Sequence, residues 1–393
     1  MSKNIENLIR KEIVAMKDIA WGKISSQKSI RLLWGENFVK SKELRIFLKR
    51  ELKNINLYPA QYKEELREKL ANYVNMKPEN ILPTNGSDDA IELIAKTCLS
   101  KKDEVLIPRP SFSGYVSVSQ MMGAKIHFVN LEKDFSLKSK KLEDIANKKT
   151  KIVWIANPNN PTGNILLNVQ QIEKLARYFP GLVIVDECYF EFSRVNEVPL
   201  IKRNKNVVVL RSFSKTFSLA GLRLGYIVAN KQLIKYFDRV QENNQTFGVN
   251  SLAQAAGVFL LRNTSIRNAL LNKFLEAKKN FEVNLAKIKN VELISTKTSF
   301  ILIKITGGKK TGSSLREFLK EKDIYIKNCY LYPGLGKNYA YLGIPAPPSQ
   351  KYVLELIKKH LNKKNIMKNK IKKEKIKEIM PIFRWAELQK NAK

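Results

Sequence analysis

The chain has 393 residues, 44% of them hydrophobic and 27% charged, so it is long enough for a large core and about two domains. Its three cysteines, Cys98, Cys188 and Cys329, show no Cys-x-x-Cys spacing. This argues against a disulfide framework or a cysteine metal site and favours a reducing, cytoplasmic location. The first residues lack the apolar core of a signal peptide. No run of about 18 uncharged apolar residues predicts a membrane-spanning helix.

The formal net charge is +35, from 71 basic against 36 acidic residues. Such a charge can indicate a nucleic acid or an anionic membrane as partner. Here the lysines are spread along the whole chain, and no DNA-binding motif accompanies them. A general lysine bias is the simpler interpretation, so we do not expect a nucleic-acid partner. The positive field would attract anionic substrates.

In chain order, residues 1–20 predict a helix or arm, 30–33 a short strand, and 41–53 and 61–73 two helices. From about residue 80 to 280, short apolar strands alternate with helices. This pattern predicts an α/β fold whose mainly parallel sheet is covered by helices on both faces. The expected strands are 105–107, 125–129, 152–155, 182–185, 207–210 and 225–228.

After an amphipathic helix at 267–289, the pattern predicts a smaller α+β domain. Its expected strands are 299–305, 324–326 and 339–342, and its expected helices are 314–322 and 349–361. We therefore expect four parts along the chain. They are an N-terminal arm with part of the small domain (1–50), a large cofactor-binding domain (51–285), a small C-terminal domain (286–362) and a basic C-terminal extension (363–393).

The most informative motif is SFSKTFSLAGLRLGY at 212–226, directly after an apolar strand. Ser212 and Ser214 precede Lys215 by three and one residues, and Arg223 follows it by eight. Hydroxyls and a guanidinium suit a phosphate, and a lysine beside that anion suits Schiff-base chemistry. Together they predict a seat for pyridoxal 5'-phosphate (PLP), with Lys215 bonded to its aldehyde. The alternative is a surface lysine in a serine-rich loop.

Two further motifs make that alternative much weaker. One is NPNNPTG at 157–163, and the other is VIVDECY at 183–189; each comes with an expected strand. The order of the three motifs resembles the fold-type I PLP enzymes, the aspartate aminotransferase superfamily, over roughly residues 30–360. The resemblance implies a homodimer with active sites at the subunit interface, and it implies no metal.

The resemblance also implies individual roles. Asp186 would pair with the pyridine nitrogen and keep it protonated, which makes the ring an electron sink. Asn160 and Tyr189 would hydrogen-bond the ring oxygen. Phe112 would stack on the ring face, with ordinary core packing as the alternative. Tyr58 would reach the PLP phosphate of the neighbouring subunit.

The segment TNGSDDA at 84–90 follows a strand-like pair and opens a helix. Free N–H groups at a helix start bind phosphate. Gly86 would let the backbone come close, and Ser87 or Asp88 would add donors; a simple helix cap is the alternative. With Ser212, Ser214 and Arg223, this segment would form the phosphate cup.

Within the superfamily, the chain looks most like histidinol-phosphate aminotransferase and threonine-phosphate decarboxylase. Aminotransferases of this group carry two arginines that bind substrate anions. Counting back from Gly343 places Tyr339 at the first of these positions, and Lys327 stands at the second. Asn37, in a segment that resembles the group's NENP loop, is a further expected substrate contact, as is Asn160.

This departure matters for the reaction. An arginine holds a substrate carboxylate near the ring plane, and its absence would let the carboxylate turn out of that plane and leave. We therefore expect a decarboxylase of a small O-phosphorylated amino acid, with Lys327 as the phosphate anchor. The alternative is an aminotransferase acting on a phosphorylated amine or ketone. A basic binding module would need a degraded site, yet the site residues are all present.

Overall fold

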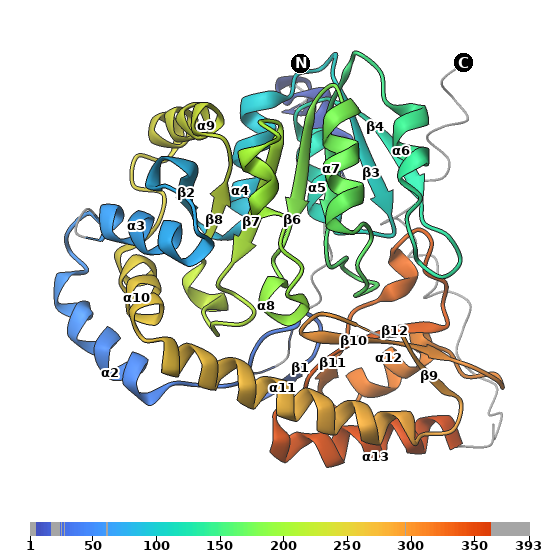
Figure 1. The fold of residues 1–393 in the computed structure, drawn as a ribbon. Coiled ribbons are helices and arrows are strands. Elements are labelled where there is room, and N and C mark those ends of the chain that lie inside the picture. Colours follow the sequence, from blue (N-terminus) through green and yellow to red (C-terminus); the bar gives the residue numbers. More distant parts are fainter. Residues whose placement is uncertain are drawn as a thin grey trace.

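The computed structural model describes residues 5–16, 24, 26, 28–59, 62–294 and 296–362. They form an α/β fold with a seven-stranded sheet between helices and a separate three-stranded antiparallel sheet (Figure 1), so the expected fold class is confirmed. The order of the large sheet is β2-β8-β7-β6-β5-β3-β4. Its strands are β2 (Ile81–Thr84), β3 (Glu104–Arg109), β4 (Lys125–Asn130), β5 (Thr150–Ala156), β6 (Leu182–Asp186), β7 (Val207–Ser212) and β8 (Gly225–Val228).

The large sheet is mixed but mainly parallel. Strands β4, β3, β5, β6 and β7 run parallel to one another, whereas β8 is antiparallel to both β7 and β2. Side chains along β6 and β7 are almost all buried, because helices cover both faces. This explains why these strands read as continuous Val/Ile/Leu runs without alternation.

Two core clusters lie on the two faces of this sheet. One face packs against α4 (Gly86–Cys98), α5 (Ser113–Met121) and α9 (Lys231–Asn244). The other packs against α3 (Lys63–Val74) and α7 (Val169–Tyr178), and the same cluster continues through α10 (Ser251–Arg262) and α11 (Thr264–Ala286) into the small sheet. Each fully buried aliphatic or aromatic side chain stabilises the fold by roughly 1.5–3 kcal/mol relative to exposure.

The second part of the fold comes from both ends of the described chain. β10 (Phe300–Ile305) lies between β9 (Val291–Ile294) and β12 (Tyr339–Gly343), all antiparallel, and β1 (Ile30–Arg31) pairs in parallel with β11 (Ile324–Tyr325). The helices of this part are α12 (Gly312–Lys320) and α13 (Pro347–Asn362). β9 was not predicted, because its four residues are only partly buried and carry no strand periodicity.

Capping side chains decide where several helices begin. Ser41 accepts the Leu44 N–H at 3.1 Å, so α2 (Lys42–Glu51) begins directly after it. Thr311 accepts the Ser314 N–H at 3.1 Å, which starts α12 two residues before the expected position. At the N-terminal end, η1 (Ile5–Leu8) and α1 (Lys11–Val14) are short. The predictions for residues 1–4, 17–23 and 363–393 lie outside the described residues, and the domain boundaries stay a prediction.

The segment 32–37 joins the two parts at the carboxyl edge of the large sheet. The Ser299 hydroxyl donates to the Gly35 carbonyl at 2.7 Å, and the Asn37 amide donates to the Thr216 carbonyl at 3.1 Å. Gly35 has a φ of +60°, and a Cβ there would lie 2.8 Å from the Tyr341 hydroxyl oxygen. Only glycine fits this approach without strain.

A buried polar network lies beneath the same edge. Arg211 on β7 donates through Nε to Glu187 Oε2 at 2.8 Å, and both side chains are at most 3% exposed. The Glu197 N–H donates to Glu187 Oε1 at 2.6 Å, and the Asn157 amide donates to Glu197 Oε1 at 2.7 Å. Burial, followed by the charge of Glu187, raises the pKa of Glu197 to about 10. Glu197 is therefore a neutral acid at neutral pH, because one guanidinium cannot compensate two buried carboxylates.

This network predicts a pH-dependent stability. Because the folded pKa of Glu197 lies far above the ordinary value of about 4.3, the stabilisation from its proton is complete at low pH and lost as the pH rises toward 10. The Glu197→Gln variant cannot ionise, so its stability relative to the native protein should increase from about pH 5 to pH 9. Thermal unfolding midpoints measure this, with exposed Glu321→Gln as control. A difference that does not change with pH would contradict the assignment.

Candidate active site

The parallel strands bring the sequence motifs together at one edge of the sheet. The NPNNPTG segment follows β5, Asp186 ends β6 and Ser212 ends β7. Because β5, β6 and β7 are parallel neighbours, their carboxyl ends meet where open α/β sheets bind ligands. Lys215 lies in the turn that follows β7.

Lys215 is largely enclosed. Its Nζ donates to the Trp34 carbonyl at 2.6 Å and lies 5.9 Å from the centre of the Tyr189 ring. Burial, followed by the positive charge of Lys327, lowers the pKa of Lys215 to about 8. The neutral amine, which attacks an aldehyde, is therefore far more populated near neutral pH than for an ordinary lysine of pKa about 10.4.

Asp186 is 8% exposed and accepts one hydrogen bond on each carboxylate oxygen. The Tyr115 hydroxyl donates to Oδ2 at 2.7 Å, and the Cys188 N–H donates to Oδ1 at 3.0 Å. Burial raises the pKa of Asp186, while these two donors act in the opposite direction. The carboxylate keeps free lone pairs for a third donor, such as a protonated ring nitrogen.

The start of α4 packs closely against β8 and Arg223. Gly86 has a φ of +84°, and a Cβ there would lie 2.6 Å from Arg223 Nη2. A Cβ on Gly225 of β8 would lie 2.8 Å from the Ser87 nitrogen. Glycine at both positions therefore lets the free N–H groups of α4 and the guanidinium converge, which is the geometry of an anion site.

The remaining members of the expected phosphate cup lie around this point. Arg223 Nη1 lies 3.3 Å from Ser214 Oγ, and Nη2 contacts Asp88 Oδ2 at 3.0 Å. The Ser212 hydroxyl accepts the Ser214 N–H at 3.2 Å. The Ser212 contact thus holds the turn that leads to Lys215, while Ser214 and Arg223 present donors to an anion.

The expected ring contacts lie at the same edge. Asn160 Oδ1 is buried and lacks a hydrogen-bond partner among the described residues, so this acceptor is available to a donor of a bound group. Tyr189 is 4% exposed and packs edge-on against Phe300, with ring centres 5.6 Å apart. Phe112 is half-buried and packs edge-on against Tyr115 at 5.5 Å. The roles of these side chains toward a cofactor stay predictions.

The expected substrate side contains one cation among aromatic rings. Lys327 Nζ lies 4.6 Å from the ring centre of Tyr341 and 5.5 Å from that of Tyr332, and it has no carboxylate partner among the described residues. Burial lowers the pKa of Lys327 to about 8. Tyr339 packs edge-on against Phe135 at 5.6 Å.

Two residues that the sequence predicts as substrate or cofactor contacts, Asn37 and Tyr58, have other partners in the structure. Both polar groups of the Asn37 side chain bond to backbone, since Oδ1 accepts the Val39 N–H at 2.9 Å and Nδ2 donates to Thr216. Asn37 thus fixes the loop beside Lys215, and a substrate contact stays a prediction. Tyr58 is 78% exposed and stacks on Phe247, with ring centres 4.4 Å apart.

Sequence reasoning missed four residues of the site: Trp34, Tyr115, Cys188 and Tyr341. Tyr115 had a readable signal, because it stands three residues after Phe112 on the same helix face. The Trp34 contact uses a backbone carbonyl, and Tyr341 reaches the site only through the register of β12. Neither has a signal in a single sequence.

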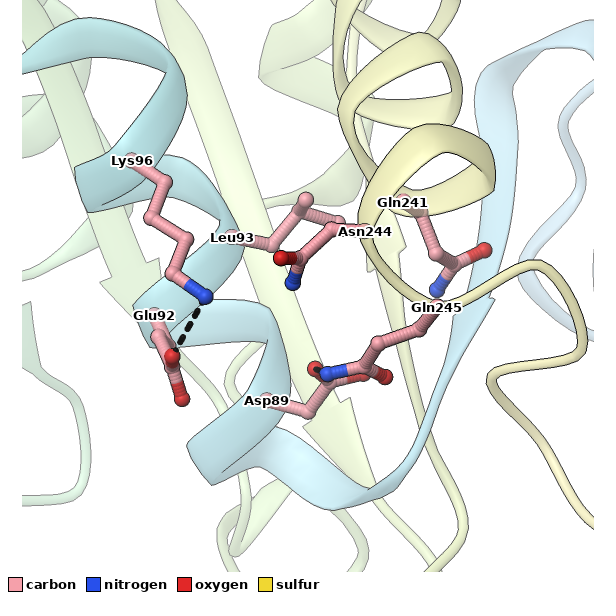
Figure 2. Close-up of a pocket in the computed structure, with 7 residues that line it drawn as sticks. All are labelled: Asp89, Glu92, Leu93, Lys96, Gln241, Asn244 and Gln245. Atoms are coloured by element: carbon pink, nitrogen blue, oxygen red, sulfur yellow. Dashed lines mark hydrogen bonds and ion pairs between the residues drawn. The ribbon is translucent and has the colours of Figure 1, made fainter.

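Figure 2 shows a small pocket between α4 and α9. Its polar groups are largely bonded to one another: Asp89 accepts from the Asn85 N–H at 2.8 Å and from Gln245 Nε2 at 3.3 Å, and Lys96 contacts Glu92 at 2.7 Å. These contacts hold the start of α4 against α9. We therefore assign the pocket a structural role. It is lined by Asp89, Glu92, Leu93, Lys96, Gln241, Asn244 and Gln245.

Within the residues that the structure describes, no helix is long and apolar enough to cross a membrane. Among the same residues, no three histidines, cysteines or carboxylates gather in a way that would hold a metal ion.

Lys215, the Asp186 carboxylate, the anion cup and Asn160 Oδ1, which has no partner among the described residues, fit PLP as a set. Residues 34–337 match the family model for aminotransferase class I and II. The chain belongs to this family of PLP-dependent enzymes.

Individual relatives refine the comparison. The chain is 34% identical over 283 residues to histidinol-phosphate aminotransferase of Caldanaerobacter subterraneus subsp. tengcongensis, covering 72% of this chain and 78% of that one. The structure of L-threonine-O-3-phosphate decarboxylase from Porphyromonas gingivalis is similar, with a TM-score of 0.70 and 26% identity over 85% of this chain and 100% of that one. Histidinol-phosphate aminotransferase from Sinorhizobium meliloti, solved with PLP, shares the fold with a TM-score of 0.79 and 16% identity, covering 90% and 97%.

Proposed function

We propose that the protein is a PLP-dependent aminotransferase that acts on a small phosphorylated amine or ketone, of the histidinol phosphate type. The observation that carries this proposal is Lys327, a half-buried cation that has no carboxylate partner among the described residues and lies close enough to Lys215 to lower its pKa. The curated relatives with histidinol-phosphate aminotransferase activity support it. They favour transamination over the decarboxylation that the missing arginines suggested.

Lys327 suits an anionic substrate group. A buried ammonium without a counter-charge is costly, and an incoming phosphate would offset that cost. The aromatic rings of Tyr332 and Tyr341 beside it exclude water and strengthen the attraction. We assign the substrate phosphate to Lys327 and the apolar part of the substrate to the surrounding rings.

We assign a separate role to each of the other site residues. When bound, the cofactor supplies an electron sink next to the substrate carbon. Asp186 would hold a proton at the ring nitrogen of the cofactor. The start of α4, together with Arg223 and Ser214, would hold the cofactor phosphate. Lys215 would be the base of the site. Its lowered pKa keeps a large neutral fraction available near neutral pH, and the Trp34 carbonyl orients its amine.

Decarboxylation of a phosphorylated amino acid is the second candidate. It is favoured by Tyr339 and Lys327 at the two arginine positions and by the structural likeness to a threonine-phosphate decarboxylase. Without an arginine fork, an α-carboxylate is held less firmly near the ring plane.

Product analysis separates the two candidates. A single turnover with histidinol phosphate should give the aminated cofactor and a carbonyl product, and phosphoserine and phosphothreonine should release no carbon dioxide. The Lys327→Ala variant should bind phosphorylated substrates on the order of tenfold or more weakly, because it loses charge-assisted bonds. The affinity of this variant for histidinol, which lacks the phosphate, should change little. Lys320→Ala, which removes an exposed lysine, is the control. Stoichiometric carbon dioxide from a phosphorylated amino acid would instead establish the decarboxylase.

We also propose that the active unit is a homodimer. Ile55, Leu57, Tyr58 and Phe247 are all exposed, at 63%, 62%, 78% and 47%. This apolar surface with a stacked aromatic pair is typical of a subunit contact. A second copy that covers it would place Tyr58 near the phosphate cup of that copy.

Mixed dimers test this arrangement. Tyr58→Phe and Lys215→Ala protomers should each have low activity alone. If Tyr58 acts across the interface, a mixed dimer has one doubly altered and one intact site, so mixing should restore up to about half of the native activity per mixed dimer. Exchange is followed with differently tagged protomers. Complete exchange without recovery would place Tyr58 within its own chain.

A further inference from the structure

We propose that Tyr115 is a positioning residue of the active site: its hydroxyl holds Asp186 as an oriented anion that faces the cofactor ring nitrogen. This inference rests on the proposed role of Asp186 and goes beyond it by assigning what makes that carboxylate effective.

The position of the Tyr115 hydroxyl is tightly determined. Tyr115 lies in the first turn of α5 and is 0% exposed. Its ring stacks on Trp154 of β5, with centres 5.2 Å apart and planes 7° apart, and Phe112 packs edge-on against it. Because two aromatic neighbours hold the ring, the hydroxyl has one place to donate, Asp186 Oδ2 at 2.7 Å.

The hydroxyl is chemically matched to an anion. Burial, followed by the charge of Asp186, raises the pKa of Tyr115 well above its ordinary value, so Tyr115 stays protonated and acts only as a donor toward the carboxylate. A hydrogen bond to the charged form of a carboxylate favours that form. Tyr115 and the Cys188 N–H together therefore oppose the effect of burial on Asp186.

The hydrogen bond from Tyr115 also influences whether the proton between Asp186 and the ring nitrogen lies on the nitrogen. A proton shared between Asp186 and a pyridine nitrogen lies on the nitrogen only while the carboxylate is the weaker base. Loss of the Tyr115 donor raises the basicity of Asp186 and moves the proton toward the carboxylate. A ring without that proton is a poorer electron sink and a weaker partner for Asp186.

Packing alone does not require the hydroxyl. Phe112, one turn earlier on the same face, packs in the same aromatic group without a hydroxyl. A buried tyrosine is retained over phenylalanine where its hydroxyl has a partner, and here that partner is Asp186.

The test compares two cofactors in one variant. Tyr115→Phe keeps the ring and removes the hydroxyl. We expect its dissociation constant for PLP to rise about tenfold, the lower range for removing an outer hydrogen-bond partner of a ligating group. For the analogue with carbon in place of the ring nitrogen (1-deaza-PLP), we expect no change, because Asp186 then has no proton to hold. Equilibrium dialysis and absorbance titration measure both constants.

Control variants separate positioning from packing. Trp154→Phe keeps the hydroxyl but loosens the ring that orients it, so it should reduce the preference for PLP over 1-deaza-PLP by less than Tyr115→Phe does. Tyr115→His, which retains a donor, should recover part of the preference for PLP. Equal weakening of both cofactors by Tyr115→Phe, or no weakening, would overturn the assignment of Tyr115. Native protein that binds PLP and 1-deaza-PLP equally would instead overturn the role of Asp186 itself.

Discussion

The alternation of side chains along β6 and β7 is the constraint on which the site depends. Neighbouring residues of a strand point to opposite faces of the sheet. At the carboxyl edge, Asp186 and Ser212 share the parity of Ile184 and Leu210, which pack in the core with α4 and α5. Glu187 and Arg211 share the parity of Val185 and Val209, which pack in the core on the other face. At this edge, the residues expected to bind the cofactor therefore lie on one face of the sheet, and the buried Arg211–Glu187 ion pair lies on the other.

The two sides depend on each other. A register shift of one residue in β6 would exchange Asp186 for Glu187 and place a carboxylate without its arginine in the core. The Arg211–Glu187 pair, with Glu197 and Asn157 around it, therefore favours the register in which Asp186 meets Tyr115. Because the buried charges are costly in any other register, they also help to fix the position of Asp186, the residue expected to contact the cofactor.

Much of this was predictable from the sequence, and the rest was not for physical reasons. The strands β5, β6 and β7 carry strong apolar runs, so a mainly parallel, covered sheet was predictable, and the resemblance of the motifs that follow them to the PLP enzymes predicted that Lys215, Asp186 and Asn160 share one site. β9 is too short and too exposed to give a pattern. The Trp34–Lys215 contact uses a backbone carbonyl 181 positions away, and only the fold brings it there. Lys327 could be found by comparison with the family pattern, but the absence of a carboxylate partner among the described residues depends on the packing of β12.

The electrostatics of the site follow from two half-buried lysines. Lys215 and Lys327 both have a pKa of about 8. Lys215 lies beside Tyr189, and Lys327 lies beside the rings of Tyr332 and Tyr341. The account assigns covalent chemistry to the first and anion binding to the second. The assignment depends on position, because the two amines are similar in burial and basicity.

Borohydride reduction of the protein purified with PLP, followed by peptide mapping, tests this division most directly. We expect one PLP group per chain, attached to the peptide that contains Lys215, and no visible absorbance or label in Lys215→Ala. A label on the Lys327 peptide, or a Lys215→Ala protein that keeps the absorbance and the activity, would contradict the account.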